Sequence, residues 1–291
     1  MSPSLPVELW AKIIISSPVE DLSEVRSTCC LFAHLTHDER LWRRIHETFF
    51  SKETKPSNLS YHDHCLYLVN SEPNSLLERA SFLGNHFMVD LAISKGANRW
   101  NGAMKYAAWG GHRKLVDLFI SKGANDWDTA MVNAAEGGHH DLVDFFISKG
   151  ANRWNGAMEY AAKGGHRDLV DFFISKGATY WNLAMESAAY GGHRSLVDLF
   201  VSKGASHWDW AMVYAAFGGH RDLVDLFISK GANNWNEAMK YAAFGGHCDL
   251  VVLFISKGAN DWNLAISCAN SNNHDDLAHY LRTHPENPNR E

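Results

Sequence analysis

Histidines recur in this chain at a fixed spacing of 27 residues, and imidazole is both a metal ligand and a general base. The seven are His112, His139, His166, His193, His220, His247 and His274. Because each belongs to a separate repeat, we expect neighbouring rings to lie about one repeat apart. That separation is too large for them to share one ion at bond lengths of roughly 2 Å. The spacing therefore favours a structural role over a metal site.

Other sequence signals for chemistry are weak. The segment His62-Asp63-His64-Cys65 is a lone cluster without the paired spacing of a zinc site. The repeated Gly-Gly-His is not a phosphate loop, because no Lys-Ser/Thr follows it and no strand is expected before it. No nucleophile and base stand at a suggestive spacing. We therefore expect no catalytic residue, no metal and no cofactor, and the sequence predicts a protein that is not an enzyme.

Composition narrows the class of partner. The net charge of −6 argues against a general nucleic-acid binder, which would be basic. No apolar run approaches the roughly 20 residues that span a bilayer, and Met1–Glu20 lacks the features of a signal peptide. Five cysteines without regular spacing argue against a disulfide framework. We expect a cytoplasmic or nuclear protein that binds neither membrane nor nucleic acid.

The elements that position these residues are set by a repeat. It begins at each of seven tryptophans, namely Trp100, Trp127, Trp154, Trp181, Trp208, Trp235 and Trp262. With Trp as position 1, Asn or Asp at position 2 is interpreted as a helix N-cap. Alanines at 4, 8 and 9 predict a short first helix, which Gly-Gly at 11 and 12 ends. Apolar residues at 16, 17, 19, 20 and 21 predict a second helix, ending at a left-handed glycine at 24.

Eight such helix–turn–helix units are predicted over residues 73–288. Residues 73–99 form a diverged first copy, and the last copy begins at Trp262. In that last copy Asn272-Asn273 replaces the Gly-Gly pair. Polar terminal repeats cap a stack of repeats against water.

The phrase A-A-x-G-G-H-x-D-L-V-x-x-F-I-x-x-G-A-N resembles the ankyrin repeat. The usual ankyrin unit has about 33 residues, with a β-turn finger and a Thr-Pro-Leu-His opening. This chain lacks about six of those residues, and Trp-Asn-x-Ala-Met stands in place of that opening. The resemblance implies a solenoid without the β-finger, and we hypothesise that the tryptophans pack in the vacated space between repeats. Such short arrays look like those of large DNA viruses that infect amoebae, which implies a viral protein acting on host proteins in the host cytosol.

Four variable positions, 3, 6, 7 and 10, share one face of the first helix. In ankyrin proteins that helix lines the concave binding side. Position 10 alternates charged with aromatic residues and is therefore expected to be exposed. The tyrosines at position 7 either pack along the solenoid or face a partner, and both alternatives stay open. The predicted partner-binding residues are Trp109, Tyr190, Trp210, Phe217, Phe244, Tyr214 and Tyr241.

The first 50 residues do not follow the repeat. Their motifs are Leu5-Pro6-x-Glu8-Leu9, Ile13-Ile14, Asp21-Leu22, Val25-Arg26-x-x-Cys29, Phe32 and Leu41-Trp42. Over residues 4–46 these resemble an F-box of three helices, although Phe32 stands where many members have Trp. The resemblance implies docking on the Skp-type linker of a cullin–RING ubiquitin ligase. The linker-facing residues would be Leu5, Pro6, Leu9, Ile13, Ile14, Leu22 and Val25.

The alternative for these apolar residues is the core of a helical cap on the solenoid. Residues 47–72 are predicted to be a connector. The sequence thus predicts an all-α adaptor of an SCF-type ubiquitin ligase, whose partners are the Skp-type linker, the cullin scaffold and a protein substrate of unknown identity. The main alternative is a scaffold or decoy that masks a protein partner without causing its turnover.

Overall fold

The computed structural model describes residues 72–288 together with Arg43 and Glu47. Apart from Arg43, the predicted F-box segment 4–46 lies outside the described residues. The linker-facing residues that lie there are Leu5, Pro6, Leu9, Ile13, Ile14, Leu22 and Val25. The cluster at residues 62–65 also lies outside them.

All regular structure in the described part of the chain is helical, as sixteen helices in eight consecutive pairs and without a strand. The first helices of the pairs are α6 (Pro73–Leu83), α8 (Trp100–Trp109), α10 (Trp127–Glu136), α12 (Trp154–Gly164), α14 (Trp181–Tyr190), α16 (Trp208–Gly218), α18 (Trp235–Phe244) and α20 (Trp262–Ser271). The second helices are α7 (His86–Ser94), α9 (Arg113–Ser121), α11 (His140–Ser148), α13 (Arg167–Ser175), α15 (Arg194–Ser202), α17 (Arg221–Ser229), α19 (Cys248–Ser256) and α21 (Asp275–Thr283). The predicted all-α repeat without a β-finger is confirmed for these residues.

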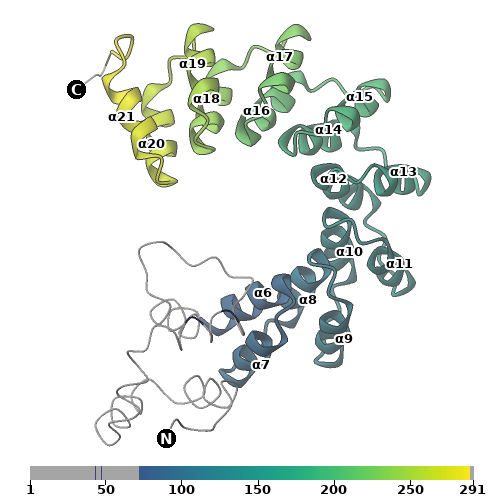
Figure 1. Ribbon diagram of the computed structural model, residues 1–291. Coiled ribbons are helices and arrows are strands. Elements are labelled where there is room, and N and C mark those ends of the chain that lie inside the picture. The colour runs from purple at the N-terminus through teal and green to yellow at the C-terminus, as the bar shows by residue number, and fades with distance from the viewer. Residues whose placement is uncertain (1–42, 44–46, 48–71, 289–291) are drawn as a thin grey trace, which may run out of the picture. The chain divides into compact units, whose positions relative to one another are not determined.

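The chain divides into two compact units, Met1–Asp126 and Trp127–Glu291. In the first unit, α6 packs against α8, and each of these helices packs against the second helix of its own pair. In the second unit, the first helices α10, α12, α14, α16, α18 and α20 pack in sequence, each against the next. These first helices lie on the inner side of the curve of the second unit, and the second helices lie on its outer side (Figure 1).

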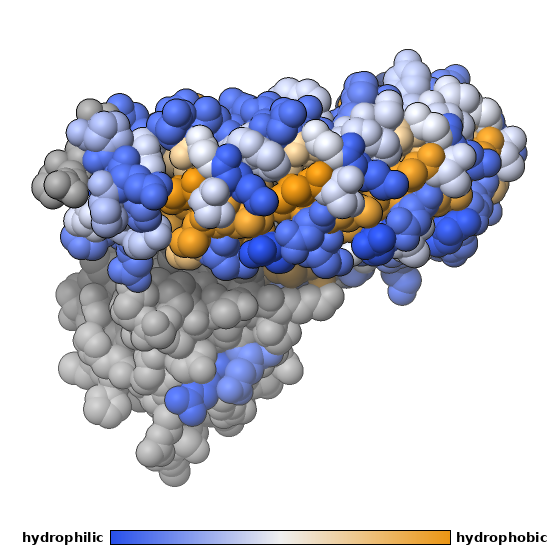
Figure 2. All heavy atoms as spheres, turned by 90° about the horizontal axis from the view of Figure 1, so that it is seen from above, coloured by the Kyte–Doolittle hydropathy of each residue, from blue (hydrophilic) through white to orange (hydrophobic). Residues whose placement is uncertain are grey.

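The core is a stripe that repeats in the six pairs from α8 to α19. Small alanines and one methionine of each first helix there are fully buried, as in Ala211 and Met212. The second helix contributes leucine, valine and phenylalanine, as in Leu223, Val224 and Phe227. Alanine allows neighbouring helices to approach closely, while each phenylalanine removes a large apolar area from water. On the face seen in Figure 2, apolar side chains form a stripe between hydrophilic side chains.

The repeating tryptophans contact the second helix of their own repeat. The Trp208 ring lies 6.4 Å from the Phe227 ring, centroid to centroid, with 27° between the planes. The same pairing occurs at Trp100, Trp154, Trp181 and Trp235. The helix hairpin places position 1 opposite position 20. The ring contact therefore lies within a repeat, and the hypothesis that the tryptophans also fill the space between repeats stays a prediction.

The N-cap prediction for position 2 was wrong. Helix α14 begins at Trp181, and Tyr180, at its cap position, makes no side-chain cap bond. Asn182 lies inside the helix, where its Oδ1 accepts from the backbone N–H groups of Ser206 at 2.7 Å and His207 at 3.2 Å. The same pair of hydrogen bonds from the loop is accepted by Asn74, Asn101, Asp128, Asn155, Asp209 and Asn236. Position 2 therefore holds the loop that leads to the next repeat.

The repeated histidines join neighbouring repeats. The Nε2–H of His220 donates to the backbone oxygen of Tyr190, position 10 of the preceding repeat, at 3.0 Å. Five further histidines make the same bond, namely His112, His166, His193, His247 and His274. These bonds satisfy carbonyls at the C-terminal end of the first helix, which have no partner inside it. The bonds confirm a structural role for these six of the seven histidines. Among the described residues, no three metal-ligating side chains gather.

The two glycines of the Gly-Gly pair are required for different physical reasons. A Cβ on Gly218 would lie 2.2 Å from the oxygen of Tyr190, so a side chain at the first glycine would separate the repeats. Gly219 has a φ of 79°, which disfavours residues with a Cβ. In the last repeat Asn273 takes this conformation with a φ of 60°. Asparagine is among the few residues that tolerate it.

Candidate partner-binding surface

Six of the seven predicted partner-binding residues form one connected group, here called the aromatic face: Tyr190, Trp210, Tyr214, Phe217, Tyr241 and Phe244. Phe217 is its centre. The Phe217 ring centroid lies 4.9 Å from Tyr190, 5.2 Å from Phe244 and 5.8 Å from Tyr241. The group spans three consecutive first helices, α14, α16 and α18.

The other end of the aromatic face continues from Tyr241 to Tyr214 at 6.4 Å, and from Tyr214 to Trp210 at 6.5 Å. Trp210 is 46% exposed and Phe244 is 41% exposed. Tyr214 and Tyr241, at position 7, are half-buried. These tyrosines therefore pack along the array and are also partly open to solvent, and their contact with a partner stays a prediction. A contiguous, exposed group of aromatic side chains is typical of a protein-binding surface.

Trp109, the seventh predicted residue, lies in the first unit. Its ring is 4.6 Å from Phe82 and 6.4 Å from Tyr106. Phe82 occupies position 10 of the diverged first repeat and is 39% exposed. Phe82 was not among the predicted partner-binding residues, although the register of the first copy places it at position 10.

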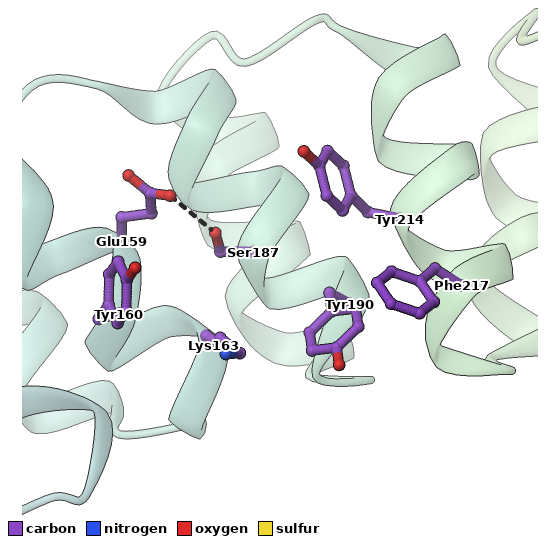
Figure 3. A pocket seen from close by; sticks show the side chains of 7 residues that line it. All are labelled: Glu159, Tyr160, Lys163, Ser187, Tyr190, Tyr214 and Phe217. Atoms are coloured by element: carbon purple, nitrogen blue, oxygen red, sulfur yellow. Dashed lines mark hydrogen bonds between the residues drawn. The ribbon is translucent and has the colours of Figure 1, made fainter. Parts of the chain in front are cut away.

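A pocket of about 260 Å³ adjoins the aromatic face (Figure 3). Three consecutive first helices, α12, α14 and α16, provide its walls. Its lining residues are Glu159, Tyr160, Lys163, Ser187, Tyr190, Tyr214 and Phe217. Three of these belong to the aromatic face, so the pocket and the face form one surface on the inner side of the second unit.

One end of the pocket already holds an ammonium group. Lys163 Nζ lies 2.8 Å from Glu136 Oε1, and 5.7 Å and 5.4 Å from the ring centroids of Tyr160 and Tyr190. Burial lowers the pKa of Lys163, but the bond to Glu136 and the charges around it raise the pKa overall. Lys163 is therefore charged, and Glu136 neutralises it.

The other end of the pocket carries a carboxylate. Ser187 Oγ donates to Glu159 Oε1 at 3.4 Å (Figure 3). Burial raises the pKa of Glu159, and this outweighs the lowering by Ser187, Arg153 and Lys163. Among the described residues, no lysine or arginine forms an ion pair with this carboxylate.

A second buried carboxylate belongs to the next repeat. Glu186 is only 7% exposed, and its Oε1 lies 3.2 Å from His207 Nδ1. Burial raises the pKa of Glu186, and the charge of Glu159 raises it further, against the lowering by His207. Burial and both carboxylates also raise the pKa of Tyr214, which indicates that its hydroxyl lies within their field. Glu159 and Glu186 occupy position 6, one of the four variable positions, but the predicted partner-binding residues are all aromatic and do not include them.

Comparison with known families agrees with this architecture. A family model described as F-box-like matches residues 2–48, and a model for ankyrin repeats, in three copies, matches residues 104–184. The chain carries an F-box-like domain and ankyrin repeats. Both resemblances that we inferred from sequence are therefore confirmed. A comparison with curated proteins finds no match.

In this F-box and ankyrin-repeat protein, the helix pairs continue on both sides of the matched ankyrin segment. F-box domains and ankyrin repeats typically act as adaptor or interaction modules. None of the helices that the structure describes is long and apolar enough to cross a membrane. The aromatic face and its pocket are therefore the best-supported candidate for a protein-binding site.

Proposed function

We propose that this protein is a substrate-recognition adaptor of an SCF-type cullin–RING ubiquitin ligase. The observation that carries the proposal is the order of its parts, an F-box-like domain at residues 2–48 followed by an ankyrin-like array. The aromatic face, in which Trp210 and Phe244 are exposed, belongs to first helices of the second unit and gives that array a surface on which a target protein can bind.

Each region then has a separate role. The F-box, with boundaries proposed at residues 4–46, docks on the Skp-type linker, and the cullin scaffold joins through that linker. Residues 47–72 connect it to an array with proposed boundaries at residues 73–288, which holds the target. Ubiquitin transfer belongs to other subunits, so no residue of this chain is assigned a catalytic role. We place the protein in the cytosol or nucleus, and in the host cytosol if its source is a virus.

The test of F-box function is capture of the Skp-type linker by the full chain. We expect a Leu5→Ala/Pro6→Ala double variant to lose at least about tenfold in capture, because truncating anchor residues at an interface core typically costs more than about 1.4 kcal/mol. Leu264→Ala, on an exposed leucine of α20, is the matched control and should capture the linker normally. Equal capture by both variants, or no capture by the unmodified chain, would refute the adaptor role.

A target-binding test addresses the aromatic face. Proximity labelling with the full chain and with Phe217→Ala/Phe244→Ala should show loss of specific partners in the double variant. Phe145→Ala/Phe172→Ala removes two half-buried phenylalanines from the second helices α11 and α13 and serves as the control. An unchanged partner list in the Phe217/Phe244 variant would show that the aromatic face is not the binding site.

The scaffold or decoy alternative makes a different prediction for the captured partner. An adaptor lowers the abundance of its target only while the proteasome is active, whereas a decoy leaves abundance unchanged in either condition. Measuring partner abundance with and without a proteasome inhibitor therefore separates the two functions.

A further inference from the structure

We propose that the pocket between α12, α14 and α16 binds one arginine or lysine side chain of the target protein at the carboxylate of Glu159, with the buried carboxylate of Glu186 behind it adding to the negative field. This inference rests on the proposed function, in which the array holds a protein target. It adds the chemistry of the target segment, which is basic and flanked by apolar residues that lie on the aromatic face.

The charges on this surface are unbalanced. Lys163 is neutralised by Glu136, and in α18 Lys240 pairs with Glu237. Glu159 has no such partner among the described residues, and only His207 lies beside Glu186, which neutralises that carboxylate only when the imidazole is protonated. Glu159 therefore lies in the field of Arg153 and Lys163 but forms no direct ion pair with either, so its end of the pocket can accept a cation.

A basic side chain of a target restores the balance. An ion that bridges from solvent to a half-buried carboxylate forms a charge-assisted hydrogen bond, which is stronger than a neutral one. The burial that raises the pKa of both carboxyl groups also strengthens their attraction for a cation.

The pocket already contains an example of this recognition. The ammonium group of Lys163 lies near the rings of Tyr160 and Tyr190, and it also binds a carboxylate. At the opposite end, the Tyr214 ring and Glu159 present the same two kinds of group, and no lysine or arginine of the described residues forms an ion pair there (Figure 3). Aromatic faces attract cations through the ring quadrupole, and arginine stacks on them especially well.

The size of the pocket favours a single side chain over a free small molecule. Its volume of about 260 Å³ is below the roughly 300–1,000 Å³ of typical small-molecule sites. Its walls come from three different repeats, and its rim continues into the exposed rings of Phe244 and Trp210. A peptide chain with a basic residue in the pocket can therefore place neighbouring apolar residues on the aromatic face.

Burial of these carboxylates also points to a function. A carboxyl group with a raised pKa destabilises the folded protein at neutral pH, and such groups are concentrated at functional sites. The equivalent positions in α10 and α16 are Val132 and Val213, both buried. The fold therefore does not require glutamate at position 6.

The test uses the full chain and four fluorescein-labelled decapeptides that share apolar flanks and differ only in a central Arg, Lys, Gln or Glu. Fluorescence anisotropy should show the Arg or Lys peptide binding about tenfold more tightly than the Gln peptide, because a hydrogen bond to a charged group discriminates by at least that factor. The preference should also fall as salt is raised. Equal binding of the Arg, Lys and Gln peptides, or no binding of any of them, would overturn the inference.

The Glu159→Gln variant should show a weaker preference for basic peptides than the unmodified chain. The Glu159→Gln/Glu186→Gln double variant should show no preference. Glu237→Gln makes the same charge change on the same side of the array but outside the pocket, so it should keep the preference. Circular dichroism establishes that each variant is folded. A basic preference that persists in the folded double variant would contradict the assignment to this pocket.

Capture of the Skp-type linker, measured on the same preparations, separates the two proposals. Retained linker capture without a basic preference overturns the pocket inference and leaves the adaptor function standing. A preference for basic peptides without linker capture overturns the adaptor function and leaves the pocket inference standing.

Discussion

Two sets of positions in each repeat behave in opposite ways. The seam between repeats, made of the position-2 Asn or Asp, the Gly-Gly pair and the following histidine, is nearly identical from copy to copy. The first-helix face at positions 3, 6, 7 and 10 changes in almost every copy. The seam uses its side chains to satisfy backbone groups, and backbone groups are the same in every repeat. The variable face contributes little to that task, so its residues are available to recognise a partner.

The largest effect on the free energy of unfolding is expected from a glycine-to-alanine substitution, which can be made both in the seam and on the variable face. Gly218→Ala, in the seam, should destabilise the protein by about 1–3 kcal/mol, because the new Cβ would lie 2.2 Å from the backbone oxygen of Tyr190. Gly156→Ala, at position 3 of α12, should instead stabilise it by up to about 1 kcal/mol. Its Cβ would meet only the flexible side chain of Arg153, at 3.2 Å. Urea unfolding of the two variants and the unmodified chain measures both changes.

Opposite signs for these two changes would confirm that the seam and the face tolerate a methyl group differently. If Gly218→Ala left the free energy of unfolding unchanged, the close approach between repeats would not limit stability, and the contrast would fail.

A smaller loss of stability is expected when the seam loses the side-chain oxygen of Asn182. Asn182→Ala should cost about 1 kcal/mol, because two backbone N–H groups of the following loop lose their acceptor. Asn182→Asp keeps that oxygen, as the natural Asp128 and Asp209 do, and should restore most of the stability. Amide hydrogen exchange at Ser206 should be faster in the alanine variant only. Equal exchange in all three proteins would show that Asn182 does not hold the loop.

Much of the fold followed from the sequence because repetition supplies many copies of one pattern. The period, the helix pairs and the left-handed glycines were all predicted and are present in the described residues. The role of position 2 was not, because an Asn or Asp near a helix start is typical of an N-cap. The competing acceptor role depends on a loop that lies 24 residues later in the chain. Sequence proximity therefore gave the wrong partner for a side chain that binds across the repeat.

The candidate site was predictable only in part. The aromatic residues stood out by type, and the structure brings six of them together. Glu159 and Glu186 did not stand out, because a glutamate on a helix is usually solvated. Glu159 lies in a pocket with residues of three consecutive first helices, and Glu186 pairs with His207 before the next helix, so no pattern within a single repeat reveals their surroundings.

The smallest change in stability is expected from replacing the partly buried Glu159, and this change should depend on pH. Burial raises the pKa of Glu159 above its usual 4.5, against the opposing influence of Arg153 and Lys163 and beside the charge of Glu186. A raised pKa means that stability is fully present below about pH 4.5 and is lost as the pH rises through the folded-state pKa. Glutamine stays neutral, so Glu159→Gln should match the unmodified chain at about pH 4 and become more stable than it towards pH 8.

Thermal unfolding across this range measures the difference, with Glu237→Gln as the reference for a half-buried carboxylate that has an ion-pair partner. A constant difference between Glu159→Gln and the unmodified chain at every pH would show that charge burial is not its cause. If the difference appears only at the higher pH values, the same substitution that removes recognition of a basic side chain also relieves the fold. Glutamate at this position would then be retained at the expense of stability, as expected of a binding residue and not of a structural one.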